Sequence, residues 1–372
     1  MTQPGPTEPA FALSGPAETL IADSVVAGFS DVAAADRQLK SGRVPIVLGA
    51  LPFDPDRAAA LMVPQGVRRT RTLPDWPTGP LPRVHVATAE PAPSEHRDRI
   101  SRVLEELGRH DGRNGALQKV VLARGLRLVA DGPLDARIVL RRLAAADPTG
   151  YGYLVDLTAA GDRHRGAALV GVSPELLVAR TGDQVSCRPF AGSAPRSDDP
   201  AVDAANGAAL VESGKNRREH QLVVDQLRTV LEPLCAQLDV APEPELSATA
   251  AVWHLSTRIT GRLRETSTTA LNLASALHPT AAVGGFPSRP AVELIRELEG
   301  NRGFYAGAVG WCNAAGDGRW VVSLRCAQLS ADRRHAVAHA GGGIVAGSDP
   351  EDELAETTAK FTTILSALAV AQ

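Results

Sequence analysis

The chain has 372 residues, 44% of them hydrophobic and 22% charged, which is typical of a globular protein and unlike a disordered one. Lys and Arg number 39 and Asp and Glu number 42, so the net charge is -3. This balance argues against a protein that binds nucleic acid or a membrane surface, because both partners require clustered positive charge. A pocket for a small anionic substrate is compatible with it.

The N-terminal segment is rich in Pro, Gly and Thr and has neither a basic region nor an apolar core, so it is not a signal peptide. We expect residues 1–16 to be a disordered leader and residues 17–372 to form a single enzyme domain. No stretch approaches the roughly 20 apolar residues that a membrane helix needs. The cysteines form no CxxC pair and are expected to be free thiols: Cys187, Cys235, Cys312 and Cys326. These features predict a cytoplasmic protein.

In chain order, short strands joined by Pro-rich loops are predicted over about residues 20–90. A helix with an apolar stripe begins at Ser94, a long helix is predicted over Ser213–Leu238, and Ala241–Ala248 is predicted to be a loop. The predicted strands are Val44–Leu51, Lys119–Arg124, Gly152–Leu157, Ala167–Arg180, Gln184–Ala191, Phe304–Trp311, Trp320–Gln328 and His335–Ala340.

The last predicted helix has clear start signals, with Asp349 as its N-cap and Pro350 at its first position. Strands and helices are grouped more than they alternate, which favours an α+β fold over a doubly wound sheet. Gly341–Ala346 fits the GxGxxA dinucleotide pattern, but no second strand with an acidic end follows it. We therefore reject a dinucleotide site.

Acidic residues occur where a buried helix face is expected. Glu219 precedes Val223 by four residues and so continues the apolar stripe of the long helix, where a carboxylate is costly unless a cation neutralises it. Glu353 and Glu356 begin the last helix, with Lys360 one turn later. Taken alone, both patterns are explained more simply by solvated helix starts. If the acids face inward, their oxygens suit Mg²⁺, which binds a few carboxylates together with water and substrate oxygens.

The Gly341–Gly343 run precedes the last helix by a few residues. Its backbone N–H groups can approach and bind an anion such as a carboxylate, because no side chain intervenes. A tight turn between a strand and the helix would explain the same run. Both interpretations stay open from these residues alone.

Several segments taken together resemble the chorismate-utilising enzymes, a family that includes anthranilate, aminodeoxychorismate, salicylate and isochorismate synthases. They lie in the family order over residues 95–372, whereas the first 90 residues match only loosely. The segments are Lys119–Arg124, Ser173–Leu177, Arg188–Arg196, Lys215–His220, His254–Leu255, His278–Thr280, Gly303–Gly307, Arg325–Cys326 and Ala340–Lys360. The resemblance implies an α+β fold like that of anthranilate synthase component I, with two β-sheet halves packed together, helices outside and the active site between them.

The resemblance also implies roles for individual residues. Glu219 and Glu356 match direct Mg²⁺ ligands, and Glu353 matches a nearby carboxylate that acts through water. The implied substrate-binding residues are Gly192, Ser193, His254, Thr280, Tyr305, Arg325, Gly341 and Gly343. An arginine suits a carboxylate because its planar fork binds both oxygens. A packed core histidine is the alternative for His254.

Two positions separate the reactions of the family. Members that use ammonia carry Gln where this chain has Lys119, and members that attack with their own lysine carry it where this chain has Ala191. The resemblance therefore implies water as nucleophile, Lys119 as its base and Glu175 as the acid that protonates the departing hydroxyl. Alternation along the strand places Lys119 on one face with Val121 and Ala123, directed at the pocket. Taken alone, Lys119 would be a solubilising lysine at a strand edge.

These matches imply an isochorismate synthase, in which Mg²⁺ supports reversible isomerisation of chorismate by water attack at C2 and loss of the C4 hydroxyl. The nearest alternative is a salicylate synthase, which would go on to eliminate pyruvate. An ammonia-using synthase and a non-catalytic anion-binding module are further alternatives. We expect a monomer that needs no amidotransferase subunit and whose product serves siderophore or menaquinone biosynthesis.

Overall fold

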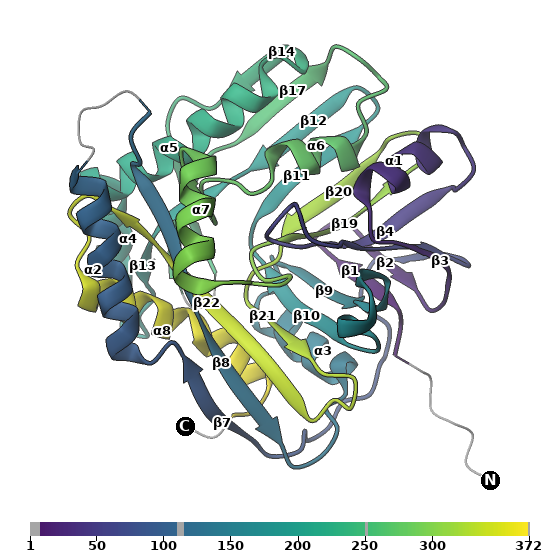
Figure 1. The fold of residues 1–372 in the computed structure, drawn as a ribbon, viewed down its shortest axis with the longest axis horizontal. Coiled ribbons are helices and arrows are strands. Elements are labelled where there is room, and N and C mark those ends of the chain that lie inside the picture. The colour runs from purple at the N-terminus through teal and green to yellow at the C-terminus, as the bar shows by residue number, and fades with distance from the viewer. Residues whose placement is uncertain (1–7, 110–114, 250–251, 371–372) are drawn as a thin grey trace.

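The structure, a computed structural model, describes residues 8–109, 115–249 and 252–370. Within these ranges two large β-sheets and one small sheet form the body, with helices around them (Figure 1). The first large sheet contains, in spatial order, β18 (Gly285–Phe286), β8 (Lys119–Ala130), β22 (His335–Val345), β21 (Cys326–Leu329), β10 (Ala168–Ser173), β9 (Tyr151–Asp156), β1 (Phe11–Ser14), β2 (Thr19–Ala22) and β6 (Arg68–Thr70), and β7 (Val84–Glu90) also pairs with β8.

The second large sheet contains, in spatial order, β14 (Cys235–Val240), β17 (Ile259–Leu263), β12 (Gln184–Arg188), β11 (Leu176–Thr181), β20 (Gly318–Val322), β19 (Ala308–Asn313), β4 (Ile46–Leu51), β5 (Ala60–Pro64) and β3 (Val25–Phe29). The small sheet contains β13 (Phe190–Pro195), β16 (Val252–Ser256) and β15 (Glu245–Ala248). The helices are α1 (Val32–Lys40), α2 (Pro93–Arg109), α3 (Ala136–Ala146), α4 (Pro200–Glu212), α5 (Gly214–Leu231), α6 (Ala270–Leu277), α7 (Ser288–Glu299) and α8 (Pro350–Ala367), with short 3₁₀ turns at Thr158–Ala160 and Asp162–His164.

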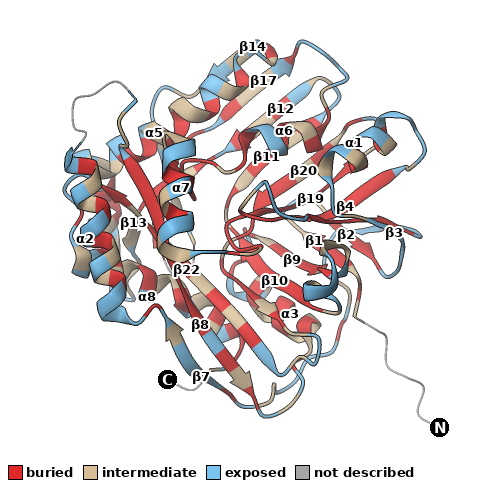
Figure 2. Cartoon of the chain, viewed as in Figure 1, coloured by how far each residue is buried: buried red, intermediate tan, exposed pale blue. Residues whose placement is uncertain are grey.

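The main apolar core joins the two large sheets. It contains Phe11 and Tyr153 from the first sheet together with Leu48 and Trp320 from the second. A second core lies between the first sheet and helices α3 and α8. Most strands in the middle of the large sheets are accordingly buried, while the outer helix faces and edge strands such as β3 and β6 are exposed (Figure 2). The expected α+β body of two β-sheet halves with outer helices is confirmed.

The chain crosses from one large sheet to the other at two adjacent places. The link Pro174–Glu175 joins β10 in the first sheet to β11 in the second, and the link Ser323–Arg325 joins β20 in the second to β21 in the first. The links are hydrogen bonded to each other's strands, because Val322 N–H donates to Glu175 O at 3.1 Å. Glu175 and Arg325 therefore occupy neighbouring points where the backbone leaves one sheet for the other.

The expected disordered leader is wrong for the part of residues 1–16 that the structure describes. Phe11–Ser14 form β1, which pairs with β2 and β9, and Phe11 is fully buried. The strand contains a short apolar run, Phe11-Ala12-Leu13, which was overlooked among the surrounding Pro and Gly residues. The core of the two sheets requires this run. Residues 1–7 lie outside the described ranges.

Several predicted boundaries are wrong for reasons that involve proline. The helix predicted over Ser213–Leu238 ends at Leu231, since Pro233 lacks an N–H group, and Leu238 belongs to β14. The strand predicted over Ala167–Arg180 is divided at Pro174 into β10 and β11, which lie in different sheets. Likewise, Pro189 separates β12 from β13.

Two further differences concern segments without strong signals. Part of the loop predicted over Ala241–Ala248 forms β15, which pairs with β16. The strand predicted over His335–Ala340 continues through the glycines to Val345, so the Gly341–Gly343 run is strand and not a turn. By contrast, the start of the last helix is confirmed, with Asp349 accepting from the N–H groups of its first turn and Pro350 as first residue. No helix in the described ranges is long and apolar enough to cross a membrane.

Candidate active site

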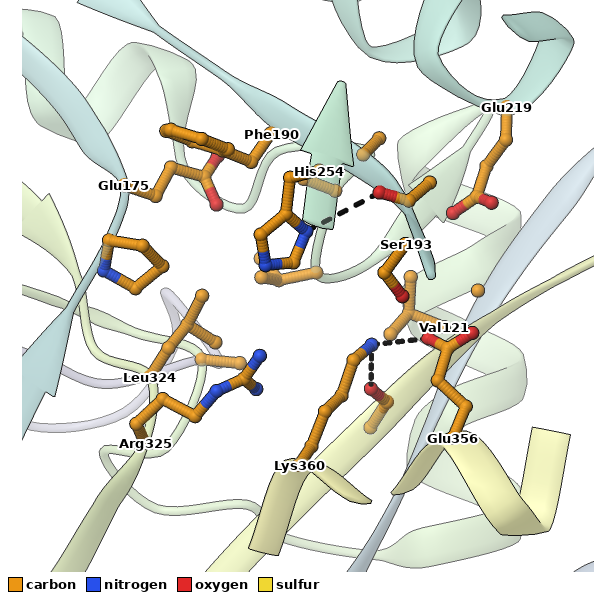
Figure 3. A pocket seen from close by; sticks show the side chains of 18 of the residues that line it. Val121, Glu175, Phe190, Ser193, Glu219, His254, Leu324, Arg325, Glu356 and Lys360 are labelled. Carbon is orange, nitrogen blue, oxygen red and sulfur yellow. Dashed lines mark hydrogen bonds and ion pairs between the residues drawn. The ribbon is translucent and has the colours of Figure 1, made fainter. Parts of the chain in front are cut away.

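A cavity lies beside the two crossings, where β8 and β22 of the first sheet meet β13, β16, α5 and α8 (Figure 3). Its empty space is about 640 Å³, including the opening to solvent. Its lining is rich in ionisable side chains and glycines: Val121, Glu175, Phe190, Ala191, Gly192, Ser193, Glu219, His254, Val283, Arg302, Tyr305, Leu324, Arg325, Gly341, Gly343, Glu356 and Lys360 are among the residues that form it.

Most of the residues expected in the site line this one cavity. They are Glu175, Gly192, Ser193, Glu219, His254, Tyr305, Arg325, Gly341, Gly343 and Glu356. Lys119, Thr280 and Glu353 are buried and are not among the residues that line the cavity. Thr280 is buried, and its hydroxyl has no hydrogen-bond partner in the described part of the chain. Residues from distant parts of the chain thus converge as the resemblance implied.

Glu175 is held at the first crossing by its own backbone. Its N–H donates to the Ser173 hydroxyl at 3.1 Å, and only 2% of the residue is exposed. Burial raises the pKa of Glu175 to about 8, although a backbone hydrogen bond from Phe190 and the positive charge of Lys119 oppose this shift. The carboxyl is therefore protonated at neutral pH and can donate a proton into the cavity.

Lys119 is the first residue of β8 and is fully buried, so a solubilising role at a strand edge is excluded. Its Nζ lies 3.0 Å from Oε1 of Glu219, although the two atoms are not aligned for a hydrogen bond. A buried ammonium is costly without a counter-charge, and Glu219 supplies it. Glu219 in turn faces the cavity from α5, which excludes the solvated first turn that the sequence left open.

Glu353 has one satisfied and one unsatisfied oxygen. Its Oε1 accepts hydrogen bonds from Lys215 Nζ at 3.0 Å and from the Ser348 hydroxyl at 2.7 Å. Its Oε2 is buried and has no hydrogen-bond partner among the described residues. Burial and the neighbouring charge of Glu356 raise the pKa of Glu353, and Lys215 opposes the shift.

Glu356 is one helical turn further along α8 and lies at the cavity surface. Lys360 donates to its Oε1 and also to the carbonyl of Gly341 at 2.9 Å (Figure 3). Burial opposes ionisation of Glu356, but the ammonium of Lys360 and the hydroxyl of Ser193 outweigh it and hold the pKa of Glu356 below its usual value. Glu356 is therefore an ionised carboxylate inside the protein.

The chemistry of these carboxylates fits Mg²⁺. They provide hard oxygen donors that are buried in Glu219 and Glu353 and partly exposed in Glu356, and Oε2 of Glu353 is a buried acceptor without a donor among the described residues. Within the described ranges, however, no three acidic, histidine or cysteine side chains already converge closely enough to hold an ion. Lysines contact each carboxylate instead, and an ion would have to replace some of these contacts.

The glycine run of β22 is required by close packing. A Cβ atom at Gly343 would lie 2.3 Å from Oε1 of Glu219 and 2.9 Å from Cε of Lys119. Gly343 pairs with Val121 and Gly341 pairs with Ala123 across the sheet. The run therefore brings bare backbone against both the carboxylate and the buried lysine.

Arg325 supplies a buried cation with free donors. It has a φ of 47°, in the left-handed region that side chains seldom adopt, and it is 9% exposed. Its guanidinium makes no hydrogen bond or ion pair with any described residue and extends into the cavity (Figure 3). Tyr305 lines the same cavity and stacks on His339 with ring centroids 5.1 Å apart. Together Arg325 and Tyr305 offer donors for a carboxylate.

His254 is held in one orientation at the centre of the site. Its Nδ1 lies 3.3 Å from the carbonyl of Gly192, whereas Nε2 is buried and has no partner among the described residues. Burial, with the charges of Arg325 and Lys360, lowers the pKa of His254 to about 3. The ring is therefore neutral, and with Nδ1–H bonded to Gly192 its Nε2 is a free acceptor for a substrate hydroxyl.

Sequence reasoning missed two basic residues of the lining. Lys360 was interpreted as part of a solvated helix face, yet it contacts Glu356 and Gly341 inside the cavity. Its position four residues after Glu356, on a helix whose other side is buried, was the signal available. Arg302 had no signal, because its contacts depend on the fold of α7 and β8.

Comparisons with known proteins identify the family. Residues 54–369 match the family model described as "Chorismate binding enzyme". A protein of Mycobacterium tuberculosis, provisionally named the isochorismate synthase MenF, is 66% identical over 98% of this chain and 97% of its own. The isochorismate synthase DhbC of Bacillus subtilis is 42% identical over 91% of this chain and 85% of its own.

A solved structure is similar over the whole fold. It is a crystal structure of a provisionally named 2,3-dihydroxybenzoate-specific isochorismate synthase, DhbC from Bacillus anthracis, with a TM-score of 0.89 and 36% identity over 98% of this chain and 97% of that one. The family model covers most of the chain, and the relatives cover nearly all of it. The chain therefore belongs to the chorismate-binding enzymes.

Proposed function

We propose that this chain is an isochorismate synthase, which converts chorismate into isochorismate by adding water at C2 and removing the hydroxyl group from C4. The observation that carries the proposal is the state of Glu175. Burial keeps its carboxyl group protonated on the cavity wall. The side of the cavity opposite Glu175 holds Glu219 and the ionised Glu356 (Figure 3), and Nζ of the buried Lys119 lies 3.0 Å from Oε1 of Glu219. Chorismate is a dianion, and Arg325 and Tyr305 are placed to bind one of its carboxylates.

In the proposed reaction Lys119 is the base that takes a proton from water as the oxygen of that water bonds to C2. Glu175 gives its proton to the C4 hydroxyl, which leaves as water while the ring double bonds shift. One water enters and one leaves, so the reaction is an isomerisation without any redox change. His254 accepts a hydrogen bond from a substrate hydroxyl through Nε2 and thereby orients the ring.

Glu219 and Glu356 would hold Mg²⁺, with Glu353 acting through water. The ion, when bound, neutralises a carboxylate of the substrate. Glu219 then has two functions, because it also contacts Lys119. The unpartnered Oε2 of Glu353 supports its inclusion in this group.

The nucleophile is inferred from two positions, one on the cavity wall and one on the adjacent strand β8. Ala191 lines the cavity at the position where an attacking lysine would stand, and it carries no amine. Lys119 stands where ammonia-using members have a glutamine. Both residues support water as the nucleophile and an activity that needs no amidotransferase.

The test is an analysis of the products formed from chorismate and Mg²⁺, with isochorismate, salicylate and anthranilate separated by chromatography. We expect isochorismate, in a mixture with chorismate that is the same whichever compound is supplied. Salicylate as the main product would identify a salicylate synthase, and anthranilate in ammonium buffer would show that water is not the nucleophile. The Glu175→Gln variant is the matched control, because it keeps the side-chain shape and removes the acidic proton.

A further inference from the structure

The edge of β8 that faces away from β22 has a gap in its pairing. At one end β18 pairs with Lys119 and Val120, and at the other β7 pairs with the residues from Gly125 to Ala130. Among the described residues no strand lies beside Val121–Arg124 on this edge, although this part of β8 is buried. Buried backbone groups without partners are costly, so the gap requires another source of hydrogen bonds.

The carbonyl of Gly284, next to β18, accepts from Val121 N–H at 2.8 Å, and two side chains near the end of α7 supply two further bonds. The N–H group of Ala123 donates to Oε1 of Glu299 at 2.7 Å, and the carbonyl of Val121 accepts from Nη2 of Arg302 at 2.6 Å. The same Nη2 lies 2.6 Å from Oε1 of Glu299, and Nε of Arg302 donates to Oε2 at 2.7 Å. The side chain of Glu299 is 6% exposed and that of Arg302 is 1% exposed.

This arrangement reproduces what a neighbouring strand would present. In an antiparallel ladder, the residues on either side of a non-hydrogen-bonded position offer a carbonyl and an N–H group to the next strand. Val121 and Ala123 stand in this relation around Leu122. We propose that Glu299 and Arg302 form a positioning pair that replaces a strand beside β8 and so fixes the backbone on which the catalytic lysine and the cavity wall depend.

The positions that the pair holds are those of the active site. On the opposite edge of β8, Val121 pairs with Gly343 and Ala123 pairs with Gly341. Lys119 is two residues before Val121 on the same strand. A shift of β8 would therefore move the lysine and the cavity glycines together.

Arg302 also holds the backbone of a second wall of the cavity. Its Nη1 donates to the carbonyl of Val283 at 2.8 Å, and its own carbonyl accepts from Tyr305 N–H at 3.3 Å. The guanidinium also lies over the Phe53 ring, 4.4 Å from its centroid. All three guanidinium nitrogens thus donate within the protein, so Arg302 acts through its neighbours although it borders the cavity.

The first test measures amide hydrogen exchange at residue resolution in the unmodified protein without substrate, so its result does not depend on the proposed function. We expect the Ala123 amide to exchange as slowly as amides that bond to a neighbouring strand. Exchange at Ala123 as fast as that of exposed edge amides would overturn the proposal. Because no substitution is involved, the measurement stands even if a variant fails to fold.

The second test compares Glu299→Gln and Arg302→Lys with Arg289→Gln. Gln keeps an acceptor for Ala123 but not the charge, and Lys cannot serve Val121, Val283 and Glu299 together. Arg289 is the control, since it pairs with Glu293 on the same helix but is 90% exposed. We expect faster exchange at Ala123 and kcat reduced by up to about 10²-fold in Arg302→Lys, with a smaller loss in Glu299→Gln and none in the control.

The Michaelis constant distinguishes positioning from direct contact. A positioning pair should lower kcat more than it raises KM for chorismate, and exchange and kcat should change in the same order among the variants. A raised KM with unchanged exchange at Ala123 would show that Arg302 binds substrate itself, and the proposal would then be wrong. If the chain made no isochorismate at all, the exchange result would still decide the pairing of β8.

Discussion

The two sides of the cavity keep their glutamates in opposite states by different means. Glu175 has no cation in direct contact among the described residues, so loss of water outweighs the hydrogen bond from Phe190 and the charge of Lys119 and raises its pKa to about 8. Glu356 is less enclosed, with 29% of its side chain exposed, and it carries the Lys360 ammonium, which holds its pKa below the usual value. Full burial without a cation in contact thus favours a proton donor, whereas partial exposure with an ammonium in contact favours an anionic ligand.

The largest effect is expected where the anionic side is neutralised. Glu219→Gln and Glu356→Gln remove a charged oxygen donor that the proposed Mg²⁺ would need, so turnover should fall to that of the unmodified enzyme in excess chelator. Activity of the unmodified enzyme should return on adding Mg²⁺. Isochorismate formation and Mg²⁺ binding by calorimetry are the two measurements. Full activity after exhaustive chelation would contradict the assignment of a metal to this side.

The second-largest effect is expected for Glu175, the proposed acid. Glu175→Gln should lower kcat by about 10² to 10⁴-fold, the usual contribution of a positioned proton donor. In the unmodified enzyme the carboxyl must be protonated to act, so activity should fall as the pH rises through about 8, the pKa of Glu175. The pH profile of kcat tests this limb. A profile that stays flat to pH 9 and above would exclude Glu175 as the acid.

The carboxyl group of Glu175 should also make the stability of the protein depend on pH. Its pKa is 4.5 in the unfolded chain and about 8 in the folded protein, so the folded state binds the proton more tightly. The stabilisation is complete below pH 4.5 and is lost as the pH rises to about 8, at about 1.4 kcal/mol per pH unit. Glu175→Gln should lack this slope. Denaturant titrations of both proteins across this range measure the difference, and parallel curves would refute the prediction.

The smallest effect concerns the contact between Lys119 and Glu219. Removing the ammonium that lies 3.0 Å from the carboxylate should make Mg²⁺ bind more tightly, because a competing cation is lost. We expect Lys119→Gln to lower the Kd for Mg²⁺ by several-fold, apart from the loss of turnover of about 10² to 10⁴-fold that follows from removing the base. Calorimetry without substrate measures the Kd directly. Weaker binding in the variant would mean that Lys119 supports the ion site and does not compete with it.

What the sequence predicted depended on how local the signal was. The start of α8 was predictable because Asp349 and Pro350 act on the adjacent turn. The segments that carry the resemblance identified the cavity residues across the chain, since each has a fixed place in the family pattern. Glu175 and Lys119 were identified in this way and not by any local rule.

The remaining features of the fold and the site could not be predicted, because they depend on contacts between residues far apart in the sequence. The apolar run of β1 is too short to stand out between Pro and Gly, yet two sheets need it for their core. Lys360 looks like a surface residue until α8 is packed against β22. The pairing of Arg302 with Val121 joins residues far apart in the chain, and no pattern in either segment reports it.

The two adjacent crossings have a mechanical consequence. Glu175 and Arg325 each sit on a link between the large sheets, so a ligand that touches both is attached to strands of both sheets at once. Any sliding of one sheet against the other would strain those contacts. A bound substrate should therefore hold the two sheets together, so that both halves of the molecule become more resistant to unfolding when the cavity is filled.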